Sequence, residues 1–207
     1  MKNKSVESLR LFDNDLLEAL THVHPALPAI VWSPIVVYLY YYGIEIKGLP
    51  LSEVAIVSFV GLLVWTFTEY ALHRWAFHFP AKSKFGKRIV FLFHGNHHDV
   101  PNDKTRLVFP PVPAMIIMFF LWQFFALIVP ARFIEVFMGS FTVGYLCYDY
   151  IHYATHHFPM TSKVGKYLRK YHLQHHYQGR AAKYGVSNPL WDYIFQTVEG
   201  PLKKKVN

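Results

Sequence analysis

The chain has 207 residues, of which 53% are hydrophobic, and it carries 21 Lys and Arg against 13 Asp and Glu. This length suits one domain, but the apolar residues form long blocks with most of the charge between them, which excludes an ordinary soluble protein. The single cysteine, Cys147, lies in an apolar block where we expect it to pack, and it excludes an internal disulfide and a cysteine-ligated metal site.

Residues 1–25 form an amphipathic, polar N-terminal segment. The segment contains neither the apolar core nor the small-residue cleavage site of a secretory signal. We therefore expect it to stay on the cytoplasmic side, ahead of a membrane domain that occupies residues 26–207.

Four apolar stretches are candidates for membrane-spanning helices, because roughly 20 apolar residues cross a hydrocarbon layer about 30 Å thick. They comprise residues 26–46, 51–72, 112–129 and 132–151. A tight turn at residues 48–50 and another at Pro130 join them into two hairpins.

The cations are distributed unevenly around these stretches. Nineteen Lys and Arg lie before the first stretch, between the second and third, or after the fourth, and two lie in the turns at 47–52 and 130–132. Because cytoplasmic loops carry an excess of Lys and Arg, both termini and the long polar segments are predicted to be cytoplasmic. The predicted fold is an all-α integral membrane protein with four transmembrane helices in two hairpins and a cytoplasmic helical cap. The basic cap would face anionic lipid headgroups, and we infer no nucleic-acid partner.

Histidines gather in four groups just beyond the second and fourth stretches. Ten of the thirteen fit the spacings HxxxxH, HxxHH, HxxxH and HxxHH: His73, His78, His94, His97, His98, His152, His156, His172, His175 and His176. Neutral imidazole is a ligand for zinc, copper, iron and nickel. Ten ligands are too many for one ion, so the pattern predicts a site for two metal ions.

Helical spacing suggests how the ligands divide. Histidines at positions i and i+4 share a helix face and can chelate one ion, whereas the histidine between them points aside. Residues 73 and 78 are about 140° apart on an ideal helix and need a bent helix end to converge. The predicted sets are His73, His78, His94, His98 and His175 for one ion, and His97, His152, His156, His172 and His176 for the other. His157 is a possible additional ligand.

Two carboxylates precede histidines by about one helical turn. Glu69 lies four residues before His73, and Asp149 lies three residues before His152. A carboxylate that accepts the second ring N–H of a ligand fixes its tautomer and direction. We expect Glu69 and Asp149 to be such partners, and we expect no catalytic residue beyond the metal ligands.

The sequence lacks modules that would supply other chemistry. It has no dinucleotide or phosphate-binding glycine motif, no flavin or haem module, and no Ser or Cys nucleophile near the histidines in sequence. If the reaction is redox, electrons must come from an external protein, and the basic surface favours an acidic donor.

Several stretches resemble the fatty acid hydroxylase superfamily of membrane di-metal oxygenases, and within it the fatty acid 2-hydroxylases. They are TEYALHRWAFHF (68–79), HGNHHDVPNDKTRLVFPPVP (94–113), VGYLCYDYIHYATHH (143–157), KYHLQHHY (170–177) and YGVSNPLWDYIF (184–195). RLVFPP and YDYIHY are more discriminating than the histidines. Eukaryotic members often carry a fused N-terminal cytochrome domain, which residues 1–25 cannot hold; His24-Pro25 lacks the glycines of its haem motif.

The resemblance implies O2-dependent hydroxylation of a long fatty acyl chain, free or amide-linked in a ceramide-like sphingolipid, at the carbon next to the carbonyl. It implies iron in the active enzyme, with zinc possible after purification, and a cytochrome- or ferredoxin-like electron donor. A sterol or carotenoid hydroxylase and an acyl desaturase are the nearest alternatives, followed by a membrane zinc hydrolase or a metal transporter. The expected location is the bacterial inner membrane or the endoplasmic reticulum. Lys204-Lys205 resembles a dilysine retention signal, which a basic tail explains equally well.

Overall fold

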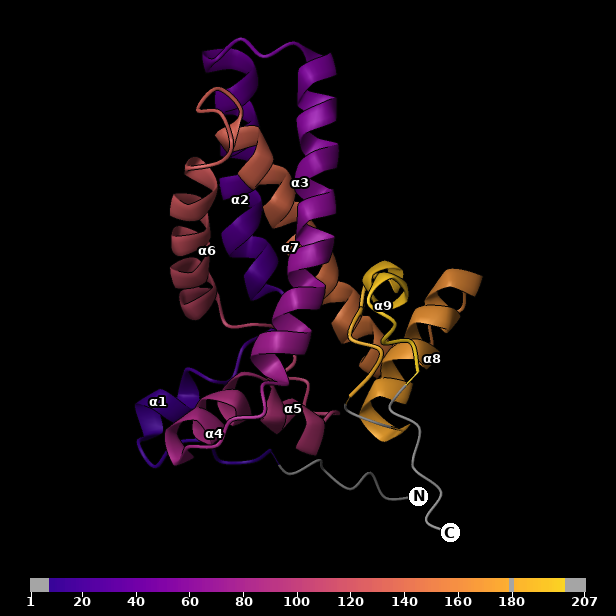
Figure 1. Cartoon of the computed structure of the whole chain (residues 1–207). Coiled ribbons are helices and arrows are strands. Elements are labelled where there is room, and N and C mark those ends of the chain that lie inside the picture. Colours follow the sequence, from indigo (N-terminus) through magenta and orange to yellow (C-terminus); the bar gives the residue numbers. More distant parts are fainter. Residues whose placement is uncertain (1–7, 179–180, 200–207) are drawn as a thin grey trace.

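The computed structural model describes residues 8–178 and 181–199, and within them the chain is helical with no strand (Figure 1). The terminal pair Lys204-Lys205 lies outside the described residues. The α-helices are α1 Asp15–Ala19, α2 Leu27–Tyr41, α3 Leu51–Ala71, α4 Lys84–Val90, α5 Asn96–Asp99, α6 Pro111–Ala126, α7 Ile134–His157, α8 Lys163–Gln178 and α9 Leu190–Ile194. Three π-helical turns continue or join them: η1 Tyr42–Ile46, η2 Leu72–Phe77 and η3 Phe91–Gly95.

Two continuous helices, Leu27–Ile46 and Leu51–Phe77, are long and apolar enough to cross a membrane. They correspond to the first two predicted stretches, and Gly48 makes the turn between them with φ +64°, a conformation that glycine adopts without strain. Helix α6 has 16 residues and ends before the predicted stretch 112–129 does, because Pro130 disfavours helix in the residues preceding it. Helix α7 continues through its histidines to His157, six residues past the predicted end.

Helix α7 forms the centre of the helical bundle and packs against α2, α3 and α6. Its buried residues Phe137, Phe141 and Tyr145 meet Trp32 of α2 and Trp65 of α3 in one apolar core. A Cβ at Gly144 would lie 2.5 Å from Cγ of Trp65, so glycine permits the close approach of α3 and α7. Cys147 differs from its expected packing role, since it is exposed.

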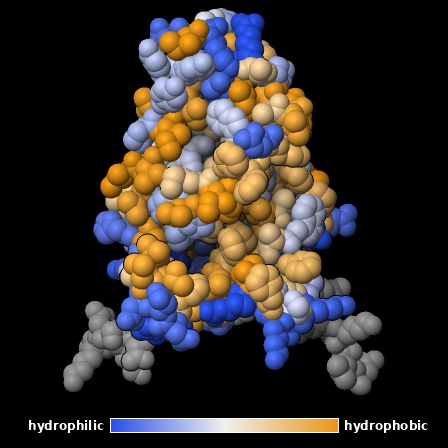
Figure 2. All heavy atoms as spheres, turned by 90° about the vertical axis from the view of Figure 1, so that its left-hand side faces the viewer, coloured by the Kyte–Doolittle hydropathy of each residue, from blue (hydrophilic) through white to orange (hydrophobic). Residues whose placement is uncertain are grey.

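The outer faces of α2, α3 and α6 carry a broad band of exposed apolar side chains. Examples are Ile30, Val37, Ile56, Phe59, Ile116 and Phe120. Figure 2 shows this band between hydrophilic surfaces at the two ends of the molecule. An apolar surface of this extent indicates contact with a membrane or with another protein, because water-soluble proteins rarely expose large contiguous patches.

Residues 8–25 pack onto the end of the bundle that bears the histidines. The backbone N–H of Val23 donates to the carbonyl of Thr105 at 2.7 Å, and Arg106 forms an ion pair with Glu18. Burial raises the pKa of Glu18, but the N–H groups of Phe12 and Leu11 and the Arg106 guanidinium outweigh that effect and lower it to about 2. Specific contacts therefore hold the described part of the segment 1–25 against the end of the bundle that bears the histidines.

Candidate metal centre

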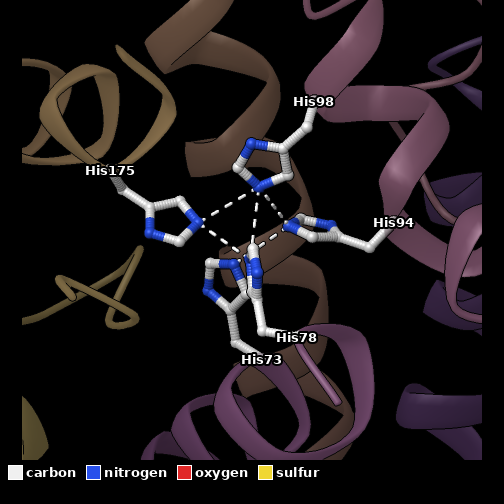
Figure 3. Close-up of side chains that lie close together, drawn as sticks. All are labelled: His73, His78, His94, His98 and His175. Carbon is white, nitrogen blue, oxygen red and sulfur yellow. Dashed lines mark hydrogen bonds between the residues drawn. The ribbon is translucent and has the colours of Figure 1, made fainter. Parts of the chain in front are cut away.

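Five histidines from four parts of the chain form the first cluster: His73, His78, His94, His98 and His175. Their Nε2 atoms point toward a common centre (Figure 3). The Nε2–Nε2 separations are 3.0 Å for His73–His94 and His94–His98, 3.2 Å for His78–His98, and 3.0 Å for His78–His175. The candidate ligand atoms all lie within 4.8 Å of one another.

The π-helical turn η2 brings His73 and His78 onto one face. The backbone N–H of His78 donates to the carbonyl of His73 at 3.1 Å, an i→i+5 bond that makes residues five apart neighbours. On an α-helix the two side chains would diverge by about 140°. The expected bent helix end is therefore a π turn, and a second one, η3, carries His94.

The second cluster comprises His97, His152, His156, His172 and His176. The Nε2 atoms of His97 and His152 are 2.9 Å apart, and Nε2 of His172 lies 2.9 Å from that of His156 and 3.0 Å from that of His176. The pairs from α7 and α8 are each four residues apart, so each pair shares a helix face.

Adjacent histidines connect the two clusters. Residues 97 and 98 follow one another on α5, and residues 175 and 176 follow one another on α8. Neighbouring residues on a helix point about 100° apart, so one member of each pair enters each cluster. The rings of His98 and His176 stack with centroids 4.2 Å apart. The structure thus brings together the two predicted sets of five and leaves His157 outside both.

These spacings fit the ligand atoms of metal ions. For a metal–nitrogen bond of about 2.0–2.1 Å, two ligands at a right angle lie about 2.9 Å apart. Hydrogen bonding among the rings explains the spacing less well. The Nδ1 atoms of His73 and His175 lie 2.5 Å and 2.6 Å from the carbonyl oxygens of Tyr184 and Ala182. Each Nδ1 must donate there, so each neutral ring presents only a lone pair at Nε2.

Burial keeps these histidines in the neutral form. Desolvation, reinforced by neighbouring imidazoles, holds the pKa of His94, His97 and His172 well below the usual value for histidine. Neutral imidazole is the form that binds a metal.

Glu69 does not take the position expected from its spacing to His73. Its Oε1 accepts the backbone N–H groups of Val186 and Ser187 at 2.7 Å and 2.8 Å, and Oε2 accepts the Ser187 hydroxyl. Glu69 therefore anchors the loop whose Tyr184 carbonyl contacts His73, and its influence on that ligand is indirect.

Asp149 also accepts a hydrogen bond from a backbone group, whereas the expected partner was the ring of His152. Its Oδ1 accepts the N–H of Phe109 at 3.0 Å, which fixes the segment that follows Arg106. Histidine spacing did not identify Asp192, a fully buried carboxylate that accepts the N–H groups of Tyr184 and Gly185 at 2.9 Å and 2.7 Å. An acidic residue within the aromatic stretch WDYIF was the available signal.

A cavity of about 340 Å³ reaches both clusters. His94, His97 and His152 lie in its wall together with apolar residues that include Trp65, Met118 and Leu121. Trp65 of α3 lines this cavity, whereas Phe119, Phe120 and Phe124 are exposed on α6. The lining is mostly apolar, so the cavity offers an apolar space beside the cluster histidines.

The model of the fatty acid hydroxylase family matches residues 58–197. The chain is 38% identical over 196 residues to a dihydroceramide fatty acyl 2-hydroxylase of Arabidopsis thaliana, covering 94% of this chain and 82% of the relative. It is 36% identical to the fatty acid 2-hydroxylase of Rattus norvegicus, covering 92% of this chain and 56% of that protein. A solved structure of full-length Scs7p, with only the hydroxylase domain visible, superposes with a TM-score of 0.85 at 34% identity, covering 93% of this chain and 74% of that one.

Proposed function

The chain belongs to the fatty acid hydroxylase family, and from that membership we propose that it hydroxylates long fatty acyl groups at carbon 2, using O2 and two metal ions. One observation carries the proposal: two sets of five convergent histidines adjoin a cavity with apolar walls. Relatives named as fatty acid and dihydroceramide 2-hydroxylases support the position of attack. The substrate is a free fatty acid or an acyl chain amide-linked in a ceramide-like lipid.

The two clusters would each hold one ion, iron in the active enzyme and zinc where expression supplies it. When bound, such a pair shares the redox change of O2 activation between two centres. In the balanced reaction one oxygen atom enters the C–H bond and the other leaves as water, with two electrons from an external donor protein and two protons. The carbonyls of Ala182 and Tyr184 keep His175 and His73 oriented, so that each Nε2 would be available to an ion at the first cluster.

The cavity would position the acyl chain. Its apolar wall at Trp65, Met118 and Leu121 excludes water from the alkyl tail, while His94 and His97 face the carbon to be oxidised. The polar headgroup stays in the membrane interface as the tail stays in apolar surroundings. Depth and headgroup anchoring then select carbon 2, so the enzyme should tolerate a range of acyl lengths.

We propose that α2, α3, α6 and α7 all span the membrane, with both termini and both clusters on the cytoplasmic side. The exposed apolar band and the nineteen-to-two distribution of cations support this topology. The two cations at the opposite end are each paired, Lys47 with Glu135 at 2.5 Å and Arg132 with Glu53 at 2.8 Å. A bacterial inner membrane or the endoplasmic reticulum would provide this arrangement.

The test is mass spectrometry of lipids from cells with and without the chain, grown under ¹⁸O2. We expect 2-hydroxy acyl chains that carry one ¹⁸O, and we expect His97→Ala and His176→Ala to abolish them while the protein still inserts in the membrane. A new double bond, an altered sterol or carotenoid, or activity without O2 would contradict the proposal and identify a desaturase, another hydroxylase or a hydrolase.

A further inference from the structure

Helix α8 has two faces of different chemistry. Gly165, Leu168, His172 and His175 are buried and form its inner face. The helix also carries Lys163, Lys166, Arg169 and Lys170, and it contains no Asp or Glu. The three lysines are exposed, so the outer face is strongly basic.

A hollow of about 440 Å³ lies along this outer face. We call it the basic groove and define it by Lys166, Arg169, Lys170, Leu173, Gln174 and Tyr177. Among the described residues, the ion pairs of the protein involve other cations, such as Lys47, Arg106 and Arg132, and none of the groove. The groove therefore presents positive charge that is not neutralised by the described part of the chain.

The basic groove lies close to the second histidine cluster. Gln174 and Leu173 lie between His172 and His176 in sequence, and the Tyr177 ring lies 6.1 Å from the His176 ring. Arg169 Nε donates to the carbonyl of Thr155 at 3.0 Å, directly before His156. The groove thus leads to the cluster through adjacent side chains.

The cavity of about 340 Å³ described above, in which we propose that the acyl chain binds, is called the acyl cavity. It reaches the same cluster from another direction. His97 and His152 line that cavity, and no residue of α8 does. In Figure 1, α8 and α6 lie on opposite sides of α7. A protein bound in the basic groove would leave the acyl cavity accessible.

We propose that the basic groove is the docking site of the electron donor, a one-electron carrier protein with an acidic surface. This inference rests on the proposed function, which requires two electrons from outside the chain. Complementary charge accelerates and orients such encounters. A concave surface with Leu173 and Tyr177 in its wall fits a protruding protein surface better than the flat array of anionic lipid headgroups.

The test compares two triple variants in nanodiscs of zwitterionic lipid. Lys163→Gln/Lys166→Gln/Lys170→Gln removes three charges from α8, and Lys82→Gln/Lys84→Gln/Lys87→Gln removes three exposed charges on and beside α4, on the other side of the cap. Arg169 is left in place because it contacts Thr155. The probes are an acidic [2Fe–2S] ferredoxin and an acidic b-type cytochrome, and their binding is measured by biolayer interferometry at several salt concentrations.

At least one probe should bind the wild type, and the α8 variant should weaken that binding by about tenfold, as expected for the loss of three exposed ion pairs. The α4 variant should bind as the wild type does. Absence of binding by both probes, or equal weakening in both variants, would overturn the inference. Loss of association with anionic vesicles in the α8 variant, with donor binding retained, would assign the groove to lipid and would also overturn it.

A second measurement separates this inference from the proposed function. Iron-loaded protein reduced chemically with dithionite needs no donor, so both variants should form 2-hydroxy product in a single turnover. Donor-driven turnover should fall only in the α8 variant. Absence of product in the dithionite reaction of the wild type refutes the proposed function, whereas equal donor-driven rates in both variants refute docking at the basic groove.

Discussion

Glu69 and Asp149 bind backbone N–H groups, although each lies about one helical turn from a cluster histidine. The spacing of Glu69 and Asp149 from the histidines correctly placed both carboxylates near the clusters. Spacing along one helix cannot predict which backbone groups from distant segments will bind them. Glu69 accepts three hydrogen bonds from residues more than a hundred positions away. At the residue scale the site depends on carboxylates that hold the loops, and the loops then hold the ligands.

Glu69→Ala should weaken metal binding at the first cluster by about 10–100-fold, the usual cost of losing an outer hydrogen-bond partner of a metal site. The reason is that the loop carrying the Tyr184 carbonyl loses its anchor. Glu69→Gln should stay close to wild type, because its amide oxygen can still accept both N–H groups. Chelator titration with elemental analysis measures the effect, and the ion at the second cluster is the internal control. Equal loss of both ions, or no loss, would contradict this role.

Three π turns distinguish the helices of this chain from regular α-helices, and two of them carry first-cluster histidines. π turns are rare and often occur at functional sites. The apolar stretches and the histidine spacing predicted helices here and a bent helix end at residues 73–78, but gave no sign of the extra residue per turn. At the element scale, this local change of pitch converts the awkward HxxxxH spacing into a pair of convergent ligands.

Deleting Ala76, an exposed residue of η2, should convert this π turn to an α turn and leave His78 four residues after His73, still on the same helix face. The deletion variant should therefore keep its first-cluster ion, whereas His78→Ala should lose first-cluster metal affinity by at least about tenfold. Both variants should keep the ion of the second cluster. Metal stoichiometry in purified, membrane-inserted protein compares the two variants. Loss of the first-cluster ion from the deletion variant would contradict this account of the π turn.

At the scale of the whole molecule, α7 is surrounded by α2, α3 and α6, and this arrangement joins the apolar bundle to the cap. The final turns of α7 supply two histidines, and α8 returns beside them to supply three. The acyl cavity forms where α6 and residues 11–21 meet this junction. The proposed substrate access, metal binding and membrane position thus depend on the same set of packed helices.

The proposed topology of four membrane-spanning helices can be tested at the two ends of this bundle. In a Cys147→Ser background, single cysteines at Gly48 and Thr161 should react with a membrane-impermeant maleimide from opposite sides of the membrane. Gly48 lies in the turn that joins η1 to α3, and Thr161 lies in the segment that joins α7 to α8, near the histidine clusters. By sequence, Gly179 would also serve as the labelling position on the predicted cytoplasmic side, but it lies outside the described residues. Labelling of both cysteines from one side would contradict four spanning helices.

Gently purified protein should contain about two metal ions per chain, one for each set of five histidines. Zinc should predominate after heterologous expression, because imidazole ligands bind it tightly and it is available, whereas turnover should require replacement by iron. Inductively coupled plasma mass spectrometry before and after reconstitution measures both quantities. A single ion per chain, or hydroxylation by the zinc form, would be inconsistent with the proposed centre.

The sequence by itself determined the helical class, the positions of the apolar stretches and the division of ten histidines into two sets of five. These features are local, since they depend on hydrophobic length and on residue spacing along helices. Tertiary structure decided the π turn at His73, the loop contacts of Glu69, Asp149 and Asp192, and the separate positions of the acyl cavity and the basic groove. Those features join residues far apart in the chain, and their formation depends on how packed helices position backbone groups that carry no signature in the sequence.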